Sequence, residues 1–197
     1  MVMKKIFLLL AFALGINASV LAQGQTTFTY SIGFGTGDLG DFIGQPSFRG
    51  FTLDYRHMVQ PNIAVGFDLG WNVFYEEKGS QTYNVDNQSL TGKQYRYSNN
   101  FPMLATGTYF LKPEETLNPY AGLGLGTMFT RRNTDMNLYT LEQEAWSFAL
   151  QPEIGFQYEV APQMALTAAL KYYVGFKAGD LDSDQSYLAL NLGFTFK

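Results

Sequence analysis

The strongest constraint on how this chain folds is an unbroken alternation of residue types over its last segment. Successive side chains of a β-strand point to opposite faces, so residues two apart share a face. From Tyr187 to Phe196, one face carries only leucine and phenylalanine, whereas the other carries Tyr, Ala, Asn, Gly and Thr. In a soluble sandwich the apolar face would point inward, yet here the opposite face is small and mildly polar. The pattern therefore predicts a strand of a membrane barrel, with lipid outside and a packed or wet interior.

Similar alternation recurs in other segments, which turn signals separate from one another. The clearest segment runs from Ile63 to Val73, where large apolar residues alternate with Ala, Gly, Asp and Asn. The segment 102–111 is the least regular, and its facing stays open. The predicted strands cover residues 27–34, 51–56, 63–75, 102–111, 121–129, 146–158, 166–176 and 187–196. Strands of about 9 to 11 residues cross a bilayer at the usual tilt, so these segments suit a membrane wall.

The connections between the predicted strands are alternately long and short. The short ones each contain a proline, and the long ones are polar. They cover residues 59–62, 112–118 and 160–163, against 37–47, 77–94 and 131–145. This order is typical of an up-and-down barrel with short periplasmic turns and long outer loops, and not of a sandwich with Greek-key crossings. We therefore predict an all-β fold, an eight-stranded antiparallel up-and-down transmembrane β-barrel.

The beginning of the chain has the features of an export signal. Two lysines precede an apolar run over residues 6–16, which is shorter than the about 20 residues that a membrane-spanning helix needs. Val20, Leu21 and Ala22 then offer small residues at the positions that a signal peptidase reads. We predict a signal peptide over residues 1–22, followed by a barrel domain over residues 23–197. The absence of cysteine leaves no lipoprotein attachment site, disulfide or thiolate metal site.

Composition narrows the classes of function. The chain has 17 acidic and 13 basic residues, and loss of two lysines with the signal peptide moves the net charge from −4 to near −6. Nucleic-acid binding depends on clustered Lys and Arg, so this charge argues against it. Charged residues make up only 15% and aromatic residues 16%, whereas soluble domains carry about 25% charged residues. Much of the surface therefore need not contact water.

Two short segments allow comparison with a known group of proteins. Residues 119–126 read Pro-Tyr-Ala-Gly-Leu-Gly-Leu-Gly, and residues 193–196 read Gly-Phe-Thr-Phe. Together with the alternating strands, they resemble the small outer-membrane β-barrel proteins, a group that includes OmpA-, OmpX- and OmpW-like barrels. The resemblance implies a monomer in the bacterial outer membrane, in contact with membrane lipid and lipopolysaccharide and inserted by the barrel-insertion machinery. Because the motifs are generic, the resemblance transfers no functional residue.

Five charged residues are predicted to point into the barrel. They are Asp54, Arg56, Asp68, Glu153 and Lys171. If a three-residue turn pairs Val160 with Met164, Glu153 falls opposite Lys171, and Arg56 lies within about one rung of Asp68. Buried charges persist mainly when paired, and an eight-stranded barrel is only wide enough for side chains to fill it. We therefore favour a structural charge network over a proton or ion path.

Two motifs match ligand-binding patterns only in part. Residues 35–40 match G-x-G-x-x-G after a strand, but a dinucleotide site also needs a helix that begins at the loop, and residues 42–47 lack helical periodicity. A flexible outer loop is predicted instead. Asp180, Asp182 and Asp184 have the spacing that begins a calcium loop, without the glycine and glutamate that complete one. A solvated acidic loop is the favoured interpretation, and a loose divalent-cation site is the alternative.

Aromatic residues are predicted to form two girdles at the membrane surfaces. Tyr55 and Tyr158 lie near short turns. The girdle towards the long loops contains Trp71, Tyr75, Trp146 and Phe176. His57 is the only histidine, and its place near a short turn suits the interfacial girdle better than the role of a general base. We therefore predict no enzymatic activity and no cofactor.

Two hypotheses for function remain. In the first, the protein has a structural or interaction role through its outer loops, where Tyr83, Tyr95 and Tyr97 could anchor a partner protein. In the second, it is a conduit or binder for small hydrophobic molecules. The aromatic side chains that would line such a conduit are Phe74, Tyr109, Tyr120 and Tyr173. A barrel plugged by paired charges would favour the first hypothesis, and an open cavity with a gap in the wall would favour the second.

Overall fold

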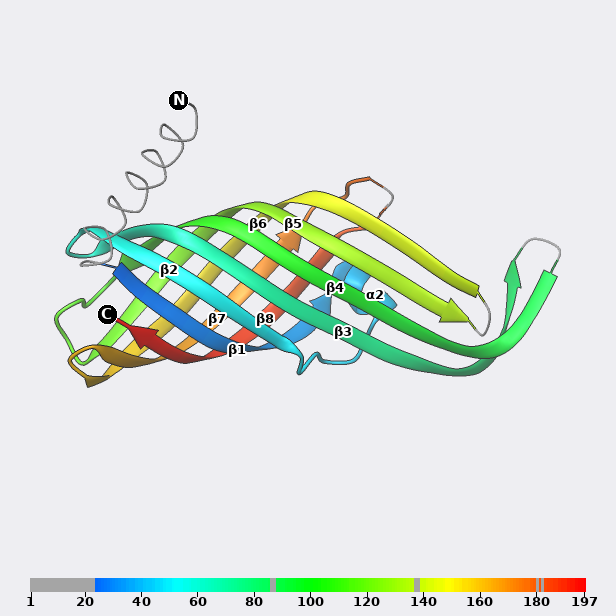
Figure 1. Ribbon diagram of the computed structural model, residues 1–197, viewed down its shortest axis with the longest axis horizontal. Helices are drawn as coiled ribbons and strands as arrows, with labels where there is room; N and C mark the ends of the chain where they lie inside the picture. The colour runs from blue at the N-terminus through cyan, green and yellow to red at the C-terminus, as the bar shows by residue number, and fades with distance from the viewer. Residues whose placement is uncertain (1–23, 86–87, 137–138, 180, 182) are drawn as a thin grey trace, which may run out of the picture.

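The computed structural model describes residues 24–85, 88–136, 139–179, 181 and 183–197, without the side chains of residues 81–85, 88–91 and 139. In this part of the chain, eight antiparallel strands pair in chain order, and the last pairs with the first, so the sheet closes into a barrel (Figure 1). The strands are β1 (Gly24–Thr36), β2 (Gly50–Gln60), β3 (Ile63–Val85), β4 (Gln88–Phe110), β5 (Leu117–Met136), β6 (Tyr139–Ala161), β7 (Met164–Gly175) and β8 (Gln185–Phe196). The predicted fold is confirmed.

Large apolar side chains cover the outside of the barrel, and small or polar side chains fill the inside. On β8, Leu192 and Phe194 are each 46% exposed, whereas Asn191 and Thr195 are 0% exposed. A wall of this kind suits lipid because closure leaves no strand edge unpaired within it. The alternation in the sequence therefore predicted the facing of β8 correctly.

A chain of aromatic contacts runs around the outer surface, on the side of the long connections. Trp71 meets Phe51 edge-on at 5.6 Å between ring centroids and stacks on Phe101 at 5.8 Å. The chain continues from Phe101 to Phe129 at 6.2 Å and from Phe129 to Trp146 at 5.1 Å. Aromatic side chains prefer the membrane–water interface. This aromatic belt therefore marks one surface of the membrane.

Four neighbouring strands are much longer than a membrane requires. Strands β1, β2, β7 and β8 have 11 to 13 residues, whereas β3, β4, β5 and β6 have 20 to 23. The extra residues number about ten per strand, or roughly 30 Å along the strand direction. They extend β3 to β6 well beyond the ends of β1, β2, β7 and β8 (Figure 1). The sequence-based prediction of loops over 77–94 and 131–145 was therefore wrong. Residues 74–85, 88–99, 130–136 and 139–147 are called the projecting sheet below.

The projecting sheet is open at both sides. Strand β2 begins at Gly50, which pairs with Asn72. Before Gly50, the Arg49 carbonyl accepts the Val73 N–H, and Ser47 Oγ donates to the Val73 carbonyl. On the other side, β7 ends with Gly175 opposite Ala149. In the described part of the chain, the outer edges of β3 and β6 in the projecting sheet therefore have no strand partner.

The connection between β1 and β2 contains a short helix, α2 (Gly37–Phe42), that folds into the mouth of the barrel (Figure 1). Gly37 begins it with φ +54°, a backbone conformation that glycine adopts without strain. A Cβ on Gly40 would lie 2.8 Å from the Gly35 carbonyl oxygen, so these glycines let the helix pack closely on β1. The prediction of a flexible loop without a helix was therefore wrong, because six residues are too few to show a helical period. No helix among the described residues is long and apolar enough to cross a membrane.

Candidate functional site

The five predicted interior charges meet in one cluster inside the barrel, none more than 4% exposed. Arg56 Nη2 lies 2.8 Å from Glu153 Oε1 and 3.2 Å from Asp54 Oδ1. Lys171 Nζ lies 2.8 Å from Asp54 Oδ1 and 3.8 Å from Glu153 Oε2, and it also contacts Asp68. Among the described residues, Lys171 is the one cation that pairs with Asp68. This charge network of three carboxylates and two cations crosses the lumen from β2 and β3 to β6 and β7.

The strand register explains part of the charge network. Glu153 pairs with Lys171 across β6 and β7, which is the predicted register, although a bulge makes Ala161 rather than Val160 the partner of Met164. The closest contact of Glu153 is nevertheless Arg56, from a strand on the far side of the lumen. Sequence reasoning missed this pair because only neighbouring strands have a register that can be deduced.

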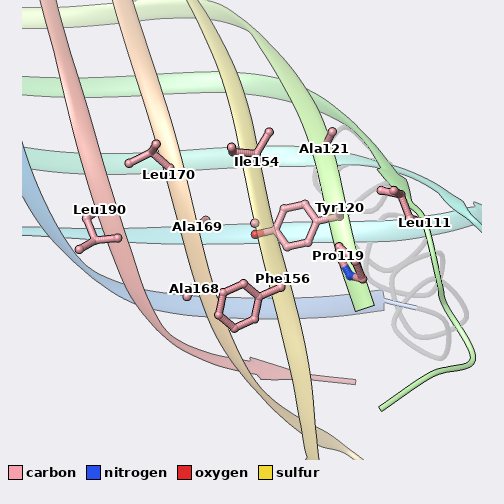
Figure 2. Close-up of a pocket in the computed structure, with 11 residues that line it drawn as sticks. Leu111, Pro119, Tyr120, Ala121, Ile154, Phe156, Ala168, Ala169, Leu170 and Leu190 are labelled. Atoms are coloured by element: carbon pink, nitrogen blue, oxygen red, sulfur yellow. The ribbon is translucent and has the colours of Figure 1, made fainter. Parts of the chain in front are cut away.

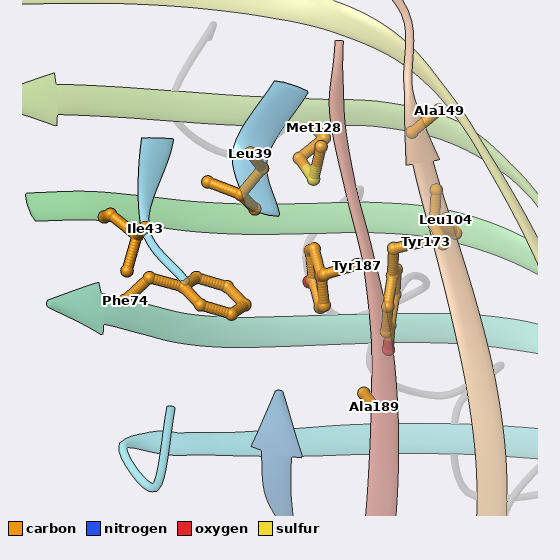
Figure 3. Packing of buried hydrophobic residues seen from close by; sticks show 9 residues of the cluster. All are labelled: Leu39, Ile43, Phe74, Leu104, Met128, Ala149, Tyr173, Tyr187 and Ala189. Carbon is orange, nitrogen blue, oxygen red and sulfur yellow. The ribbon is translucent and has the colours of Figure 1, made fainter. Parts of the chain in front are cut away.

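An apolar cluster closes the lumen between the charge network and the mouth that carries α2. Tyr173 and Tyr187 stack at 4.7 Å between ring centroids, and Phe74 meets Tyr187 edge-on at 5.3 Å. The buried members are Leu39, Ile43, Phe74, Leu104, Met128, Ala149, Tyr173, Tyr187 and Ala189 (Figure 3). Leu39 and Ile43 come from α2 and the residue after it, so this segment plugs the barrel. Their i, i+4 spacing is the signal in the sequence that could have indicated the plug.

The plug is held by two arginines at the base of the projecting sheet. Arg96 donates a hydrogen bond of 2.9 Å to the Phe42 carbonyl, and its guanidinium lies 4.9 Å from the Phe42 ring centroid. The Arg132 guanidinium lies 3.6 Å from the same centroid and donates to Ser183 Oγ at 2.7 Å. Burial and the neighbouring Arg96 lower the pKa of Arg132 to about 10, which leaves it charged at neutral pH. Both cation–π contacts therefore fix α2 in the mouth.

The other half of the lumen, towards the short turns, contains polar side chains that bond to one another, and a second apolar cluster of Ala64, Phe110, Tyr120 and Ala169. The hydroxyl of Thr195 lies 2.7 Å from that of Thr27 and 2.6 Å from that of Thr167. The Asn191 amide donates to Thr52 Oγ1 at 3.1 Å. Such cross-lumen bonds satisfy buried polar groups and hold the strands together. The lumen is thus occupied by side chains above, within and below the charge network.

Three of the four aromatic residues predicted to line a conduit point inward. Phe74, Tyr120 and Tyr173 are at most 2% exposed, but Tyr109 is 50% exposed on the outer face of β4. The inward facing assigned to Tyr109 was therefore wrong. The neighbouring inward residue Phe110 is also aromatic, so the pattern in β4 did not distinguish the two faces.

An apolar groove of about 500 Å³ lies on the outside of the wall over β5 to β8 (Figure 2). Small outward residues, Ala121 and Ala168, leave room beside the larger Ile154 and Phe156. The ring of Tyr120 belongs to the groove lining although it points inward, because it packs behind Gly155, where a Cβ would lie 2.7 Å from its hydroxyl. Tyr120 therefore closes the wall at this point, and the groove faces the acyl chains of the membrane.

The outer face of the projecting sheet carries tyrosines and paired charges. The rings of Tyr75 and Tyr97 lie 4.9 Å apart, and Lys93 Nζ lies 2.6 Å from Glu77 Oε1. Tyr95 is paired with Glu77 in the β3–β4 register. Tyr83 lies in β3, but its side chain is outside the described residues. All three tyrosines predicted as partner contacts therefore lie on the projecting sheet, and the side chains of two of them, Tyr95 and Tyr97, are described.

The remaining acidic motif is described only in part. Asp180 and Asp182 lie outside the described residues, and the backbone N–H of Asp184 donates to Asp38 at 2.9 Å. Among the residues that the structure describes, no group of three His, Cys, Asp or Glu side chains is arranged to hold a metal ion. The alternative of a loose divalent-cation site stays a prediction.

A closed barrel with a lipid-compatible face, an aromatic belt and a filled lumen defines a small outer-membrane protein. The sequence matches the outer membrane protein beta-barrel domain over residues 8–196, and the chain belongs to this family. The resemblance recognised from the sequence is thereby confirmed, and the protein is one of the bacterial outer membrane. The signal peptide itself stays a prediction, because residues 1–22 lie outside the described part of the chain.

Solved structures of small outer-membrane barrels share this fold. Neisserial surface protein A is similar with a TM-score of 0.58 at 16% identity, over 89% of this chain and 97% of that one. OprG from Pseudomonas aeruginosa has a TM-score of 0.54 at 12% identity, over 88% and 94%. Ail of Yersinia pestis has 0.51 at 15% identity, over 88% and 97%. No protein of curated function matches the sequence. These identities show the fold alone.

Proposed function

We propose that the protein has a structural and recognition role at the cell surface, in which the projecting sheet binds an extended segment of a partner protein. The observation that carries the proposal is the unpaired outer edge of β3 over residues 74–85, beyond the membrane. An unpaired strand edge presents a row of backbone donors and acceptors, and an extended peptide can add to it as a further strand. The backbone supplies affinity in this mode, and alternate side chains supply specificity.

The side chains along the β3 edge suit a selective partner. Glu76 and Lys78 form an ion pair of 3.1 Å on the lumen face, and Glu77 pairs with Lys93 on the outer face. Charges on an edge strand disfavour pairing with arbitrary strands and admit a partner of complementary charge. The tyrosines beside them, Tyr75 and Tyr97, are a residue type enriched in protein interfaces.

The rival role, a conduit for small hydrophobic molecules, requires an open lumen. The charge network, the apolar cluster and the plug occupy the lumen in sequence, and we therefore propose that the barrel serves as a membrane anchor. Within the described residues, no arrangement suggests catalysis, and we propose no enzymatic role.

The test uses two variants that shorten different hairpins of the projecting sheet. In the first, Asn-Gly replaces residues 79–93 and forms a two-residue turn between Lys78 and Gln94. This change removes most of the free β3 edge. In the second, Asn-Gly replaces residues 135–140 and joins Thr134 to Leu141, which leaves that edge intact. Lys78 pairs with Gln94, and Thr134 pairs with Leu141, in the native register, so a two-residue turn can connect the residues of each pair.

Each protein is placed in lipid nanodiscs and used to select from a random-peptide library displayed on phage. We expect peptides with alternating side-chain patterns to bind the native protein and the second variant, and to lose binding to the first. Equal binding to the first variant, or no enrichment over empty nanodiscs, would contradict the proposal. Steady conductance of the native protein in a planar bilayer would favour the conduit instead.

A further inference from the structure

A crevice of about 550 Å³ opens on the outside of the barrel at the level of the aromatic belt, where β2 begins beside β3. Its lining combines aromatic side chains with one cation. The lining residues are Tyr30, Arg49, Gly50, Phe51, Trp71, Val73 and Asn99. All large apolar members face outward, with Phe51, Tyr30 and Trp71 among the exposed hydrophobic side chains. The crevice therefore faces the outer leaflet and not the lumen.

Arg49 is the unusual member of this crevice. It is exposed, and among the described residues it takes part in no ion pair. Its guanidinium lies 5.8 Å from the ring centroid of Tyr75, and its carbonyl accepts the Val73 N–H at 2.9 Å, which fixes its backbone against β3. Arg131, at the same end of the barrel, is by contrast paired with both Glu142 and Glu144. Arg49 is thus a positive charge with no anionic partner in the described protein.

We propose that this crevice binds a phosphorylated lipid of the outer leaflet. The phosphate lies on the Arg49 guanidinium, which presents several N–H donors in a planar fork that matches phosphate oxygens. An acyl chain fills the crevice against Phe51 and Trp71, on the membrane side of the belt. The site combines a free cation at the headgroup level with an apolar slot below it, which is the chemistry of an anionic lipid. It lies on the barrel wall and does not depend on the function proposed for the projecting sheet.

The chain contains its own comparison site. A second crevice of about 390 Å³ lies at the other end of the belt and is lined by Phe129, Glu144, Ala145, Trp146 and Gly179. It has a similar aromatic wall, but its charged member is Glu144, which is already paired with Arg131 at 2.8 Å, so the second crevice offers phosphate no free cation. Each crevice contains one of the two tryptophans of the chain, Trp71 and Trp146. The two sites can therefore be observed separately by fluorescence.

The experiment uses single-tryptophan proteins in phosphatidylcholine vesicles that contain a minor share of brominated phosphatidic acid. Bromine on the chains quenches a tryptophan that it contacts. Trp146→Phe leaves Trp71 as the reporter, and Trp71→Phe leaves Trp146. We expect Trp71 to be quenched about fivefold more effectively by brominated phosphatidic acid than by brominated phosphatidylcholine at the same share, the preference that one basic residue supplies near a membrane surface. Trp146 should show no such preference.

Arg49→Gln should remove the preference at Trp71, and Arg49→Lys should restore part of it, because lysine keeps the charge without the planar fork. Added inorganic phosphate should not reduce the quenching of Trp71, because the acyl chain contributes to lipid binding. If phosphate does compete, the crevice is a site for free anions, and the lipid assignment is overturned. Equal quenching by the two lipids in the native site would also overturn it. So would a preference that survives Arg49→Gln.

Discussion

Replacing Lys171 by methionine should destabilise the barrel through one specific carboxylate. Asp54 and Glu153 both keep Arg56, at 3.2 and 2.8 Å, when the lysine is removed. Asp68 loses its ion-pair partner and stays fully buried as an unpaired charge. Breaking a buried pair from one side costs about 3 to 5 kcal/mol, and we expect Lys171→Met to cost this amount.

The structure also predicts which second substitution restores stability. Asp68→Asn removes the orphaned charge, so the double variant should recover about 2 to 3 kcal/mol. Glu153 lies opposite Lys171 in the register, but combining Glu153→Leu with Lys171→Met should recover little stability. Asp68 then stays unpaired, and Arg56 loses its closest partner. The free energies of unfolding are measured by urea titration of the folded protein in detergent. The comparison requires that all variants show the same dependence of the unfolding free energy on urea concentration. Rescue by Glu153→Leu and not by Asp68→Asn would refute the assigned pairing.

Other predictions concern the wall, the plug and the closure of the barrel. Leu123 faces lipid midway between the start of β5 at Leu117 and Phe129 in the aromatic belt. Leu123→Arg should cost about 2 to 4 kcal/mol in urea unfolding, whereas Leu141→Arg, at an exposed position on the projecting sheet, should cost under about 0.5 kcal/mol. Equal costs would contradict the assigned membrane level. Gly40→Ala should displace α2, because its Cβ would lie 2.8 Å from the Gly35 carbonyl oxygen, and faster amide exchange over residues 37–43 would report this; unchanged exchange would count against the packing. The unboiled protein should migrate differently from the boiled protein in a gel, and identical migration would argue against a closed barrel.

The sequence predicted those parts of the fold that contact lipid. Along β3, lipid on one side and the lumen on the other impose a period of two, which is visible from Ile63 to Val73. Beyond the aromatic belt both faces meet water, so the period disappears at Glu76 and Glu77 although strand pairing continues. The segments predicted as loops, 77–94 and 131–145, therefore form strands. No local sequence pattern marks the end of a strand whose two faces are both solvent-exposed.

The lumen was predictable only between neighbouring strands. Glu153 and Lys171 pair in the register of β6 and β7, as predicted, although Ala161 and not Val160 pairs with Met164 and a bulge restores the register. The contact of Arg56 with Glu153 depends on the curvature of the closed wall, which a sequence pattern does not contain. The plug was missed because the six residues of α2 are too few to show a helical period. Its glycines matched a nucleotide-binding pattern, whereas in the structure Gly35 and Gly40 serve close packing of helix on strand.

The most direct test of the central claim, a lipid-embedded barrel that carries an extracellular sheet, measures the surroundings of two leucines. Spin labels replace Leu123 on the barrel wall and Leu141 on the projecting sheet, and the protein is reconstituted in lipid vesicles. The label at 123 should collide with lipid-soluble oxygen and be shielded from a water-soluble nickel reagent, and the label at 141 should show the reverse. Nickel access at both positions would mean that the barrel is not in the membrane, and oxygen-dominated collisions at 141 would mean that the sheet does not project from it.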